Sequence, residues 1–193
     1  MALGQTLTPV GSPNTASDQQ LLGRAAEGDA DAFTELVRRY GASVLRWAQS
    51  LSGNATLSHD VAQQSLLSAY RGAHTYRGAA SVKSWLFTIT RNTARRLGAR
   101  HQLEVPHEEP LLRLGVDAGW GSPDPEMLAV RAERHAHLYA ALNRLAEADR
   151  QVILLRDIEQ LSGPEAAELL GVSLRAMKSR LHRARLRLAV ALR

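Results

Sequence analysis

The side chains in this sequence that could do chemistry are mainly arginines and lysines, gathered in two segments without an acidic residue. One segment lies between Asp60 and Glu104, and the other begins at Gly171. Cationic side chains held near a phosphate backbone displace its counterions, so each segment predicts salt-dependent binding to nucleic acid. The basic residues are Arg71, Arg77, Lys83, Arg91, Arg95, Arg96 and Arg100 in the first segment, and Arg175, Lys178, Arg180, Arg183, Arg185, Arg187 and Arg193 in the second.

Composition argues for binding and against catalysis. Lys and Arg outnumber Asp and Glu by 24 to 19 in 193 residues, which favours an anionic partner. The absence of cysteine excludes a disulfide framework, a thiolate zinc site and a cysteine nucleophile. The histidines are scattered, and the nearest pair, His135 and His137, would point to different sides of a helix. We therefore predict no catalytic residue, no metal site and no cofactor.

The beginning of the chain does not resemble a targeting segment. Residues 1–16 carry no charged side chain and mix Gly, Pro, Ser and Thr, so the basic and apolar parts of a signal peptide are missing. No apolar run reaches the length of a membrane span. We expect a disordered tail over residues 1–16 on a cytoplasmic protein that does not insert into membranes.

The elements that must position the basic residues are predicted to be helices, because apolar residues recur at three- and four-residue steps. Four helices are expected from about Asp18 to Arg100, and a Pro- and Gly-rich acidic linker over 101–124 precedes further helices over 125–193. The second helix should end at 52–54, the third should span about 58–73 and the fourth about 81–100. Val61, Leu66, Leu67 and Tyr70 are expected to face inward from the third helix.

The C-terminal segment has the plan of a helix-turn-helix. Residues 162–165 form a capping box, Gly171 ends the helix that follows, and Ser173 caps the next one. The second helix of such a motif enters the major groove of DNA. Its inward stripe is predicted to be Leu174, Met177, Leu181, Ala184 and Leu188. The opposite side then presents side chains that can reach base edges and phosphates: Arg175, Lys178, Ser179, Arg180, His182 and Arg183.

Three segments carry a family resemblance. Residues 171–185 (GVSLRAMKSRLHRAR) closely resemble region 4 of extracytoplasmic-function (ECF) sigma factors, within the sigma-70 family of bacterial RNA polymerase subunits. Residues 60–70 resemble region 2.2, and residues 84–92 resemble regions 2.3 and 2.4. The resemblance implies an all-α protein of two small domains, with region 2 at 17–100, a flexible linker at 101–124 and region 4 at 125–193.

The resemblance also implies a function and its residues. Such a protein binds core RNA polymerase, recognises the minus-35 and minus-10 promoter elements, promotes DNA melting and often has an anti-sigma partner. Asp60, Gln63 and Gln64 would contact the polymerase, and the outward residues of the last helix would read the duplex minus-35 element. The residues expected at the single-stranded minus-10 element are Tyr76, Arg77, Lys83, Trp85, Arg91, Asn92, Arg95 and Arg96.

Some alternatives stay open at this point. Trp85 lies at the border of an apolar stripe, where packing in the core and stacking on DNA are both compatible with the sequence. A helix-turn-helix regulator that reads duplex DNA alone would explain the second half of the chain but leaves the first half unexplained. An enzyme with a helical core and an attached DNA-binding domain is disfavoured by the lack of a nucleophile, metal or phosphate-binding motif.

Overall fold

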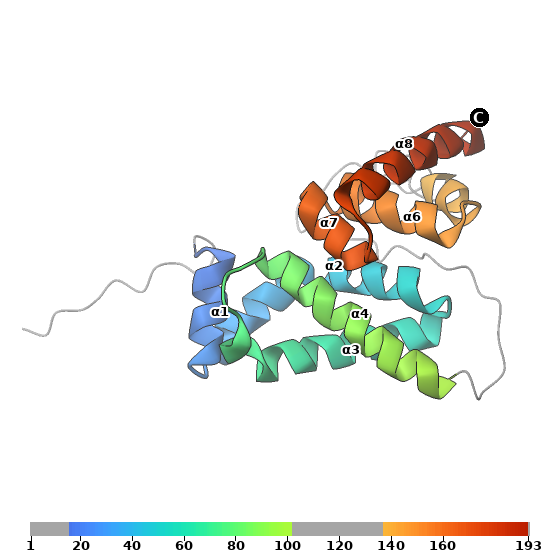
Figure 1. Cartoon of the computed structure of the whole chain (residues 1–193). Helices are drawn as coiled ribbons and strands as arrows, with labels where there is room; N and C mark the ends of the chain where they lie inside the picture. The colour runs from blue at the N-terminus through green and yellow to red at the C-terminus, as the bar shows by residue number, and fades with distance from the viewer. Residues whose placement is uncertain (1–15, 102–136, 193) are drawn as a thin grey trace, which may run out of the picture.

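The computed structural model describes residues 16–101 and 137–192, and over these ranges it contains helices and turns but no strand. Two helical domains are visible in Figure 1, which confirms the predicted fold class. The N-terminal domain contains α1 (Asp18–Ala26), α2 (Ala30–Ser52), α3 (Ala55–Arg71), the short 3-10 helix η1 (Ala73–Thr75) and α4 (Val82–His101). The C-terminal domain contains helical residues 137–143, α6 (Glu147–Ile153), the π-helical turn η2 (Leu154–Ile158), α7 (Gly163–Leu170) and α8 (Leu174–Ala191).

The helices of the N-terminal domain begin and end at residues whose side chains or backbone suit those positions. The predicted start near Asp18 is confirmed, because the Ser17 side chain and the Gln20 side chain satisfy each other's backbone N–H groups. Asn54 accepts a bond from the backbone of Leu57 and so starts α3 earlier than expected. Between α2 and α3, Gly53 adopts φ 67°, a left-handed conformation that ends α2 where predicted.

The core of the N-terminal domain is centred on Trp47, whose side chain is fully buried. Its indole N–H donates to the carbonyl of Phe87 at 3.1 Å, and the two rings stack with centroids 5.9 Å apart. Of the four residues expected to face inward from α3, Val61 is buried, but Leu67 and Tyr70 are 43% and 38% exposed. That prediction was wrong for these two residues because α3 packs through small side chains instead: Ser58, Ala62, Ser65 and Ala69.

The C-terminal domain contains the predicted helix-turn-helix. Ser162 and Glu165 form the expected capping box at the start of α7, and Gly171 ends this helix with φ 66°. In α8, Met177, Leu181 and Ala184 are buried as predicted, whereas Leu174 is 39% exposed and was wrongly placed in the inward stripe. Leu174 lies in the first turn of α8 beside Gly163, at the margin of the domain core.

A widened helical turn interrupts the helix before α7. The backbone N–H of Glu159 bonds to the carbonyl of Leu154, five residues earlier, at 2.8 Å. This spacing defines a π-helical turn, which often occurs at functional positions. Two residues after the turn, Gln160 adopts φ 56° although it is not a glycine.

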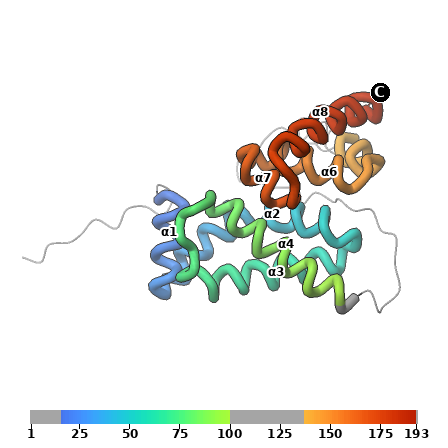
Figure 2. The backbone as a smooth tube through the Cα atoms, viewed as in Figure 1, coloured from blue at the N-terminus to red at the C-terminus, as the bar shows by residue number. Residues whose placement is uncertain are grey.

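The two domains pack directly against each other. Leu154, Leu155, Leu161, Ala166 and Leu169 of the C-terminal domain belong to the same buried apolar cluster as the core of the N-terminal domain. The tube in Figure 2 shows α7 on the side that faces the N-terminal domain, whereas α8 runs along the far side. The predicted tail over 1–16 and linker over 101–124 fall almost entirely outside the described residues, as does the expected start of the C-terminal helices at 125.

Candidate nucleic-acid interface

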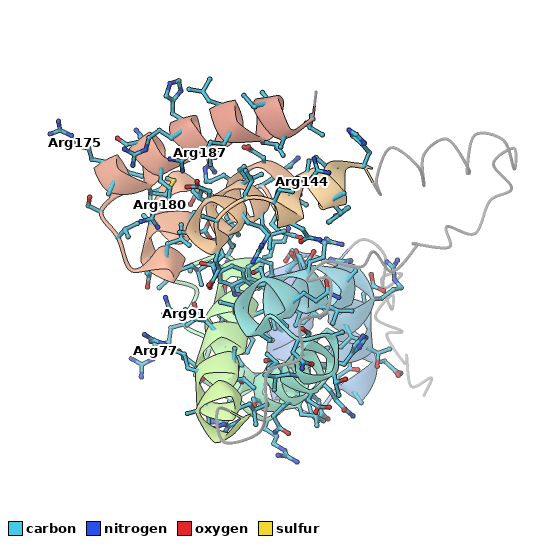
Figure 3. The ribbon with its side chains drawn as sticks, turned by 90° about the vertical axis from the view of Figure 1, so that its right-hand side faces the viewer. Arg77, Arg91, Arg144, Arg175, Arg180 and Arg187 are labelled. Carbon is cyan, nitrogen blue, oxygen red and sulfur yellow. The ribbon has the colours of Figure 1, made fainter. Side chains whose placement is uncertain are left out.

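The outer side of α8 presents the residues predicted to read duplex DNA. Arg175, Lys178, Ser179, His182 and Arg183 are exposed. In Figure 3, Arg175 points away from the rest of the protein. Arg180 also lies on α8 but is only half-exposed.

Other arginines of α8 have structural partners. Arg185 forms a bidentate ion pair with Asp157 at 2.6 and 3.0 Å, and Arg187 pairs with Asp149. These pairs join α8 to α6 and η2, so the two arginines serve the packing of the domain. The cations of α8 therefore include a paired set, which is exposed but bonded to acids of the same domain, and an outer set available to a ligand.

The second set of predicted residues lies on the loop before α4 and along α4. Arg77, Asn92, Arg95 and Arg96 are exposed, and Arg77 points into solvent in Figure 3. Arg95 and Arg96 share the C-terminal half of α4 with Asn92, so these residues form an uninterrupted polar surface.

Tyr76 and Trp85 form an aromatic pair at the base of this loop. Their rings meet edge to face with centroids 5.6 Å apart, and the Tyr76 hydroxyl donates to the carbonyl of Ala80 at 2.6 Å. Both side chains are half-buried, and Trp85 packs against the domain core. Trp85 therefore both packs in the core and leaves part of its ring accessible.

Lys83 and Arg91, the remaining predicted residues of this surface, face the C-terminal domain. The Lys83 ammonium contacts the Glu159 carboxylate and donates to the Glu159 carbonyl, each at 2.7 Å. Arg91 donates to the carbonyls of Glu168 and Leu169 at 3.0 and 2.7 Å. Figure 3 shows Arg91 at the junction of the two domains.

Glu159 is the buried acid of this junction, with a side chain only 1% exposed. Its second carboxylate oxygen accepts a bond from Arg46 Nε at 2.8 Å, so cations from both α2 and α4 contact it. Burial alone would raise the pKa of Glu159, but hydrogen bonds from Lys83 and Arg46 outweigh it and lower the pKa below its ordinary value. Glu159 is therefore held in its charged form by the opposite domain.

Glu165 links the domains through Ser81, the last residue of the loop before α4. One carboxylate oxygen accepts bonds from the Ser81 backbone and hydroxyl at 3.1 and 2.6 Å, while the other accepts the Ser162 N–H at 3.0 Å. Burial acts to raise the pKa of Glu165, but these donors lower it to about 2. The same carboxylate therefore caps α7 and fixes the start of α4.

The predicted polymerase-contact residues lie together on α3. Asp60 and Gln63 are exposed and Gln64 is half-exposed. Gln63 also borders an open groove between α2 and α3 whose walls are mostly apolar, including Phe33, Leu66, Leu67 and Tyr70. A polar patch beside an exposed apolar groove is suited to binding a protein.

Sequence analysis missed the residues that join the domains. Arg46, Glu159 and Glu165 had no predicted binding role, and Glu165 was noted only as a helix cap. Ser81 ends the loop that was predicted to bind the minus-10 element, but its contact with the C-terminal domain was not expected. Contacts such as Arg46 with Glu159 span 113 residues of sequence. No signal in the sequence singled out Glu159, because the charged residues Arg156 and Asp157 stand close beside it.

Comparison with known proteins assigns both domains to one family. Residues 36–103 match sigma-70 region 2, and residues 135–188 match sigma-70 region 4. The RNA polymerase sigma factor NccH of Alcaligenes xylosoxydans is 32% identical over 91% of this chain and 94% of its own length. The ECF RNA polymerase sigma-E factor of Haemophilus influenzae is 30% identical over 88% and 92%. The chain is an ECF sigma factor of the sigma-70 family.

Solved structures of related sigma factors agree with this fold. CnrH, in complex with the cytosolic domain of CnrY, matches with a TM-score of 0.59 and 29% identity, covering 91% of this chain and 96% of CnrH. RpoE from Bartonella quintana, in complex with the anti-sigma factor NepR, matches with a TM-score of 0.60 and 28% identity, covering 83% and 96%. The N-terminal domain of this sigma factor is accordingly called region 2 below, and the C-terminal domain region 4. Within the described parts of this sigma factor, every helix is too short or too polar to cross a bilayer.

Replacing Glu165 with glutamine is expected to remove a pH-dependent part of the stability of this sigma factor. The pKa of Glu165 falls from 4.5 to about 2 on folding, so the folded state binds fewer protons in this range. The carboxylate therefore stabilises the protein fully above pH 4.5, and this contribution is lost as the pH falls toward 2. We expect the variant to lose about 1 kcal/mol of unfolding free energy at pH 7, measured by urea denaturation.

The exposed Glu168, three residues later on α7, supplies a matched control. Glu168→Gln removes the same charge but not the cap, because only the backbone carbonyl of Glu168 contacts region 2. The difference between Glu165→Gln and the unmodified protein should shrink as the pH is lowered to 3. A difference that stays constant with pH would contradict this assignment.

Proposed function

We propose that this chain binds core RNA polymerase, recognises the minus-35 and minus-10 promoter elements and promotes DNA melting. The observation that carries the proposal is the pair of cationic faces, one on α8 and one on the loop and α4, in a chain whose two domains both match the sigma-70 family. The predicted limits of region 2 (17–100), the linker (101–124) and region 4 (125–193) are part of this proposal.

Recognition of the minus-35 element is assigned to the outer side of α8. A helix that presents arginine, lysine, serine and histidine side chains can contact phosphates and base edges in a major groove. Support comes from the exposure of Arg175, Lys178, Ser179, His182 and Arg183, with Arg180 at the flank of this group. Met177 and Leu181 hold the opposite side of α8 against the domain core and so fix which side faces outward.

Recognition of the minus-10 element is assigned to the loop and α4 of region 2. Arg77, Arg95 and Arg96 can contact the phosphates of an unpaired strand, and Asn92 can bond a base edge. The partly accessible Tyr76 and Trp85 rings offer surfaces on which bases can stack. Binding the unpaired strand better than the duplex is enough to shift the opening equilibrium, so melting requires no catalytic residue.

Contact with core RNA polymerase is assigned to α3. Asp60, Gln63 and Gln64 supply exposed polar groups, and the neighbouring apolar groove supplies area that becomes buried on binding. We further propose an anti-sigma partner, since a related sigma factor has been solved in complex with the anti-sigma factor NepR.

The experiment that tests the proposal mixes the purified full chain with core RNA polymerase. Co-elution on gel filtration and promoter-specific transcription in vitro are both expected. A control reaction with core polymerase alone should show no promoter-specific product. A chain that binds duplex DNA but neither co-elutes with polymerase nor directs initiation would instead be a stand-alone helix-turn-helix regulator.

A further inference from the structure

We propose that the hydroxyl group of Tyr76 sharpens the base preference of this sigma factor at the minus-10 element by holding the loop before α4 in one shape. Tyr76 is in this respect a positioning residue, because its hydroxyl acts through the carbonyl of Ala80 and not by a contact with DNA. The inference rests on the proposed role of this loop in binding the unpaired strand. It concerns which bases the loop accepts, and not how firmly the strand is held.

The loop of residues 77–80 has little side-chain chemistry of its own. Arg77 is its only charged residue, and Gly78, Ala79 and Ala80 have no side-chain donor or acceptor. All four residues are exposed or half-exposed. Apart from those of Arg77, hydrogen bonds between this loop and a base must therefore use backbone N–H and C=O groups. The directions of these groups depend on the shape of the loop.

One hydrogen bond closes the loop. The Tyr76 hydroxyl donates to the Ala80 carbonyl at 2.6 Å and so joins the two ends of the loop. Within the part of the chain that the structure describes, residues 77–80 take part in no other hydrogen bond. In the middle of the loop, Gly78 adopts φ 74°, in the left-handed region that favours glycine. The shape of the loop therefore depends on one side-chain bond and one glycine.

The ring of Tyr76 is itself held in place, which gives its hydroxyl a fixed direction. It meets the Trp85 ring edge to face with centroids 5.6 Å apart, and both rings pack against the core of region 2. The Tyr76 backbone N–H also donates to the Ala73 carbonyl at 3.2 Å, at the end of η1. Both partners of the hydroxyl bond belong to region 2, so the bond does not depend on where region 4 lies.

A loop held in one shape and a loose loop should differ in base preference. The held loop leaves a polar group unpaired when the wrong base is present, and an unpaired polar group is costly. A loose loop can turn away from the mismatch, so it accepts more bases, and it must also be ordered when the right base binds. Loss of the hydroxyl therefore lowers use of the preferred sequence and raises the relative use of others.

The test uses Tyr76→Phe, which keeps the aromatic ring and removes the hydroxyl. The full chain is combined with core RNA polymerase, and transcripts are sequenced from a promoter pool randomised over the minus-10 element. The ratio between the most and least favoured bases should fall by about two- to tenfold at one position or more, since one hydrogen bond changes the population of a loop shape by about that factor. Because the templates compete in one reaction, this ratio does not depend on how much of the variant is folded.

The shape of the loop is measured separately, by NMR relaxation of the backbone nitrogen atoms in the unbound full chain. The order parameters of Gly78, Ala79 and Ala80 should be close to those of a rigid backbone, about 0.85, in the unmodified protein. In Tyr76→Phe they should fall below about 0.6, while those of α4 stay unchanged.

Thr88→Val is the matched control. The Thr88 hydroxyl donates to the Ser84 carbonyl at 3.0 Å within α4, so this variant also removes a hydroxyl bond to a backbone carbonyl but leaves the loop intact. It should keep the base preference and the loop order of the unmodified protein.

Gly78→Ala alters the loop by a different route. Alanine disfavours a positive φ, whereas the space around a Cβ atom at this position is open, so the effect is on the backbone and not on packing. This variant should weaken the base preference although Tyr76 is unchanged.

The outcomes separate this inference from the proposed function. Unchanged order parameters or an unchanged base preference in Tyr76→Phe would overturn the inference, even if Gly78→Ala alters the preference. An equal loss of preference in Thr88→Val would also overturn it, since the effect would not be specific to the loop. If the unmodified chain and core polymerase fail to initiate, or initiate without any preference over the minus-10 element, the proposed function itself is wrong.

Discussion

Replacing Trp47 with alanine is expected to lower the free energy of unfolding by about 3–5 kcal/mol, the largest stability effect that we anticipate for a single substitution. The side chain is fully buried and stacks on Phe87, so truncation leaves a large apolar cavity. It also removes the donor to the buried Phe87 carbonyl, which then lacks that partner. Because domains are stable by only about 5–15 kcal/mol, this loss removes a large fraction of the stability of region 2.

The measurement is chemical denaturation followed by far-UV circular dichroism. Trp85→Ala is the matched control, since Trp85 is the same residue type in the same domain but is half-buried. It should cost clearly less than Trp47→Ala. Trp47→Phe keeps an aromatic ring but loses the N–H donor, and an intermediate loss is expected. Equal losses for Trp47→Ala and Trp85→Ala would contradict the assignment of Trp47 as the centre of the core.

Replacing Arg183 with alanine is expected to weaken use of the cognate minus-35 element by about tenfold or more, since one specific arginine–base contact is worth about 1–3 kcal/mol. The side chain is exposed on the outer side of α8. His182→Ala, at the neighbouring exposed position, should act in the same direction. The effect is measured by in vitro transcription from the cognate promoter and from versions altered in the minus-35 element.

Arg185→Ala is the control for loss of charge, because Arg185 lies on the same helix but is paired with Asp157. It should change the minus-35 preference little, although it can lower the stability of region 4. Unchanged promoter preference in both Arg183→Ala and His182→Ala would mean that the outer side of α8 does not read the promoter.

The sequence predicted local features of the fold well because they depend on neighbouring residues. Ser17, Ser162 and Ser173 cap helices as expected, and Gly53 and Gly171 end helices in left-handed conformations. In each case the side chain or the missing Cβ acts within a few residues of its own position. The order of helices in both domains follows from these signals.

Packing choices were less predictable. On α3 the large side chains of Leu67 and Tyr70 were expected inside, yet Ser58 and Ala69 occupy the buried face. Hydrophobic periodicity gives weight to large apolar residues, whereas small residues allow two helices to approach closely. The sequence contains both patterns, and only the positions of α2 and α4 decide between them.

The sequence predicted which candidate residues lie at the surface better than it predicted which of them have partners elsewhere in the chain. The outer residues of α8 and Asn92, Arg95 and Arg96 of α4 are at the surface, as their spacing indicated. Lys83 and Arg91 instead contact region 4, and no pattern along the chain predicts this, because their partners lie 76 to 78 residues away. The assignment of individual residues to promoter elements stays a prediction.

The π-helical turn over Leu154–Ile158 gives the number of residues in this segment a role separate from their identity. Each residue of a regular helix turns the chain by about 100°, so the one additional residue of the wide turn sets the direction in which Glu159 leaves the helix. Shortening the turn by a single residue would swing the carboxylate away from Arg46 and Lys83 even if every side chain were kept. The junction between the domains is therefore sensitive to insertion and deletion here, in a way that substitutions alone would not reveal.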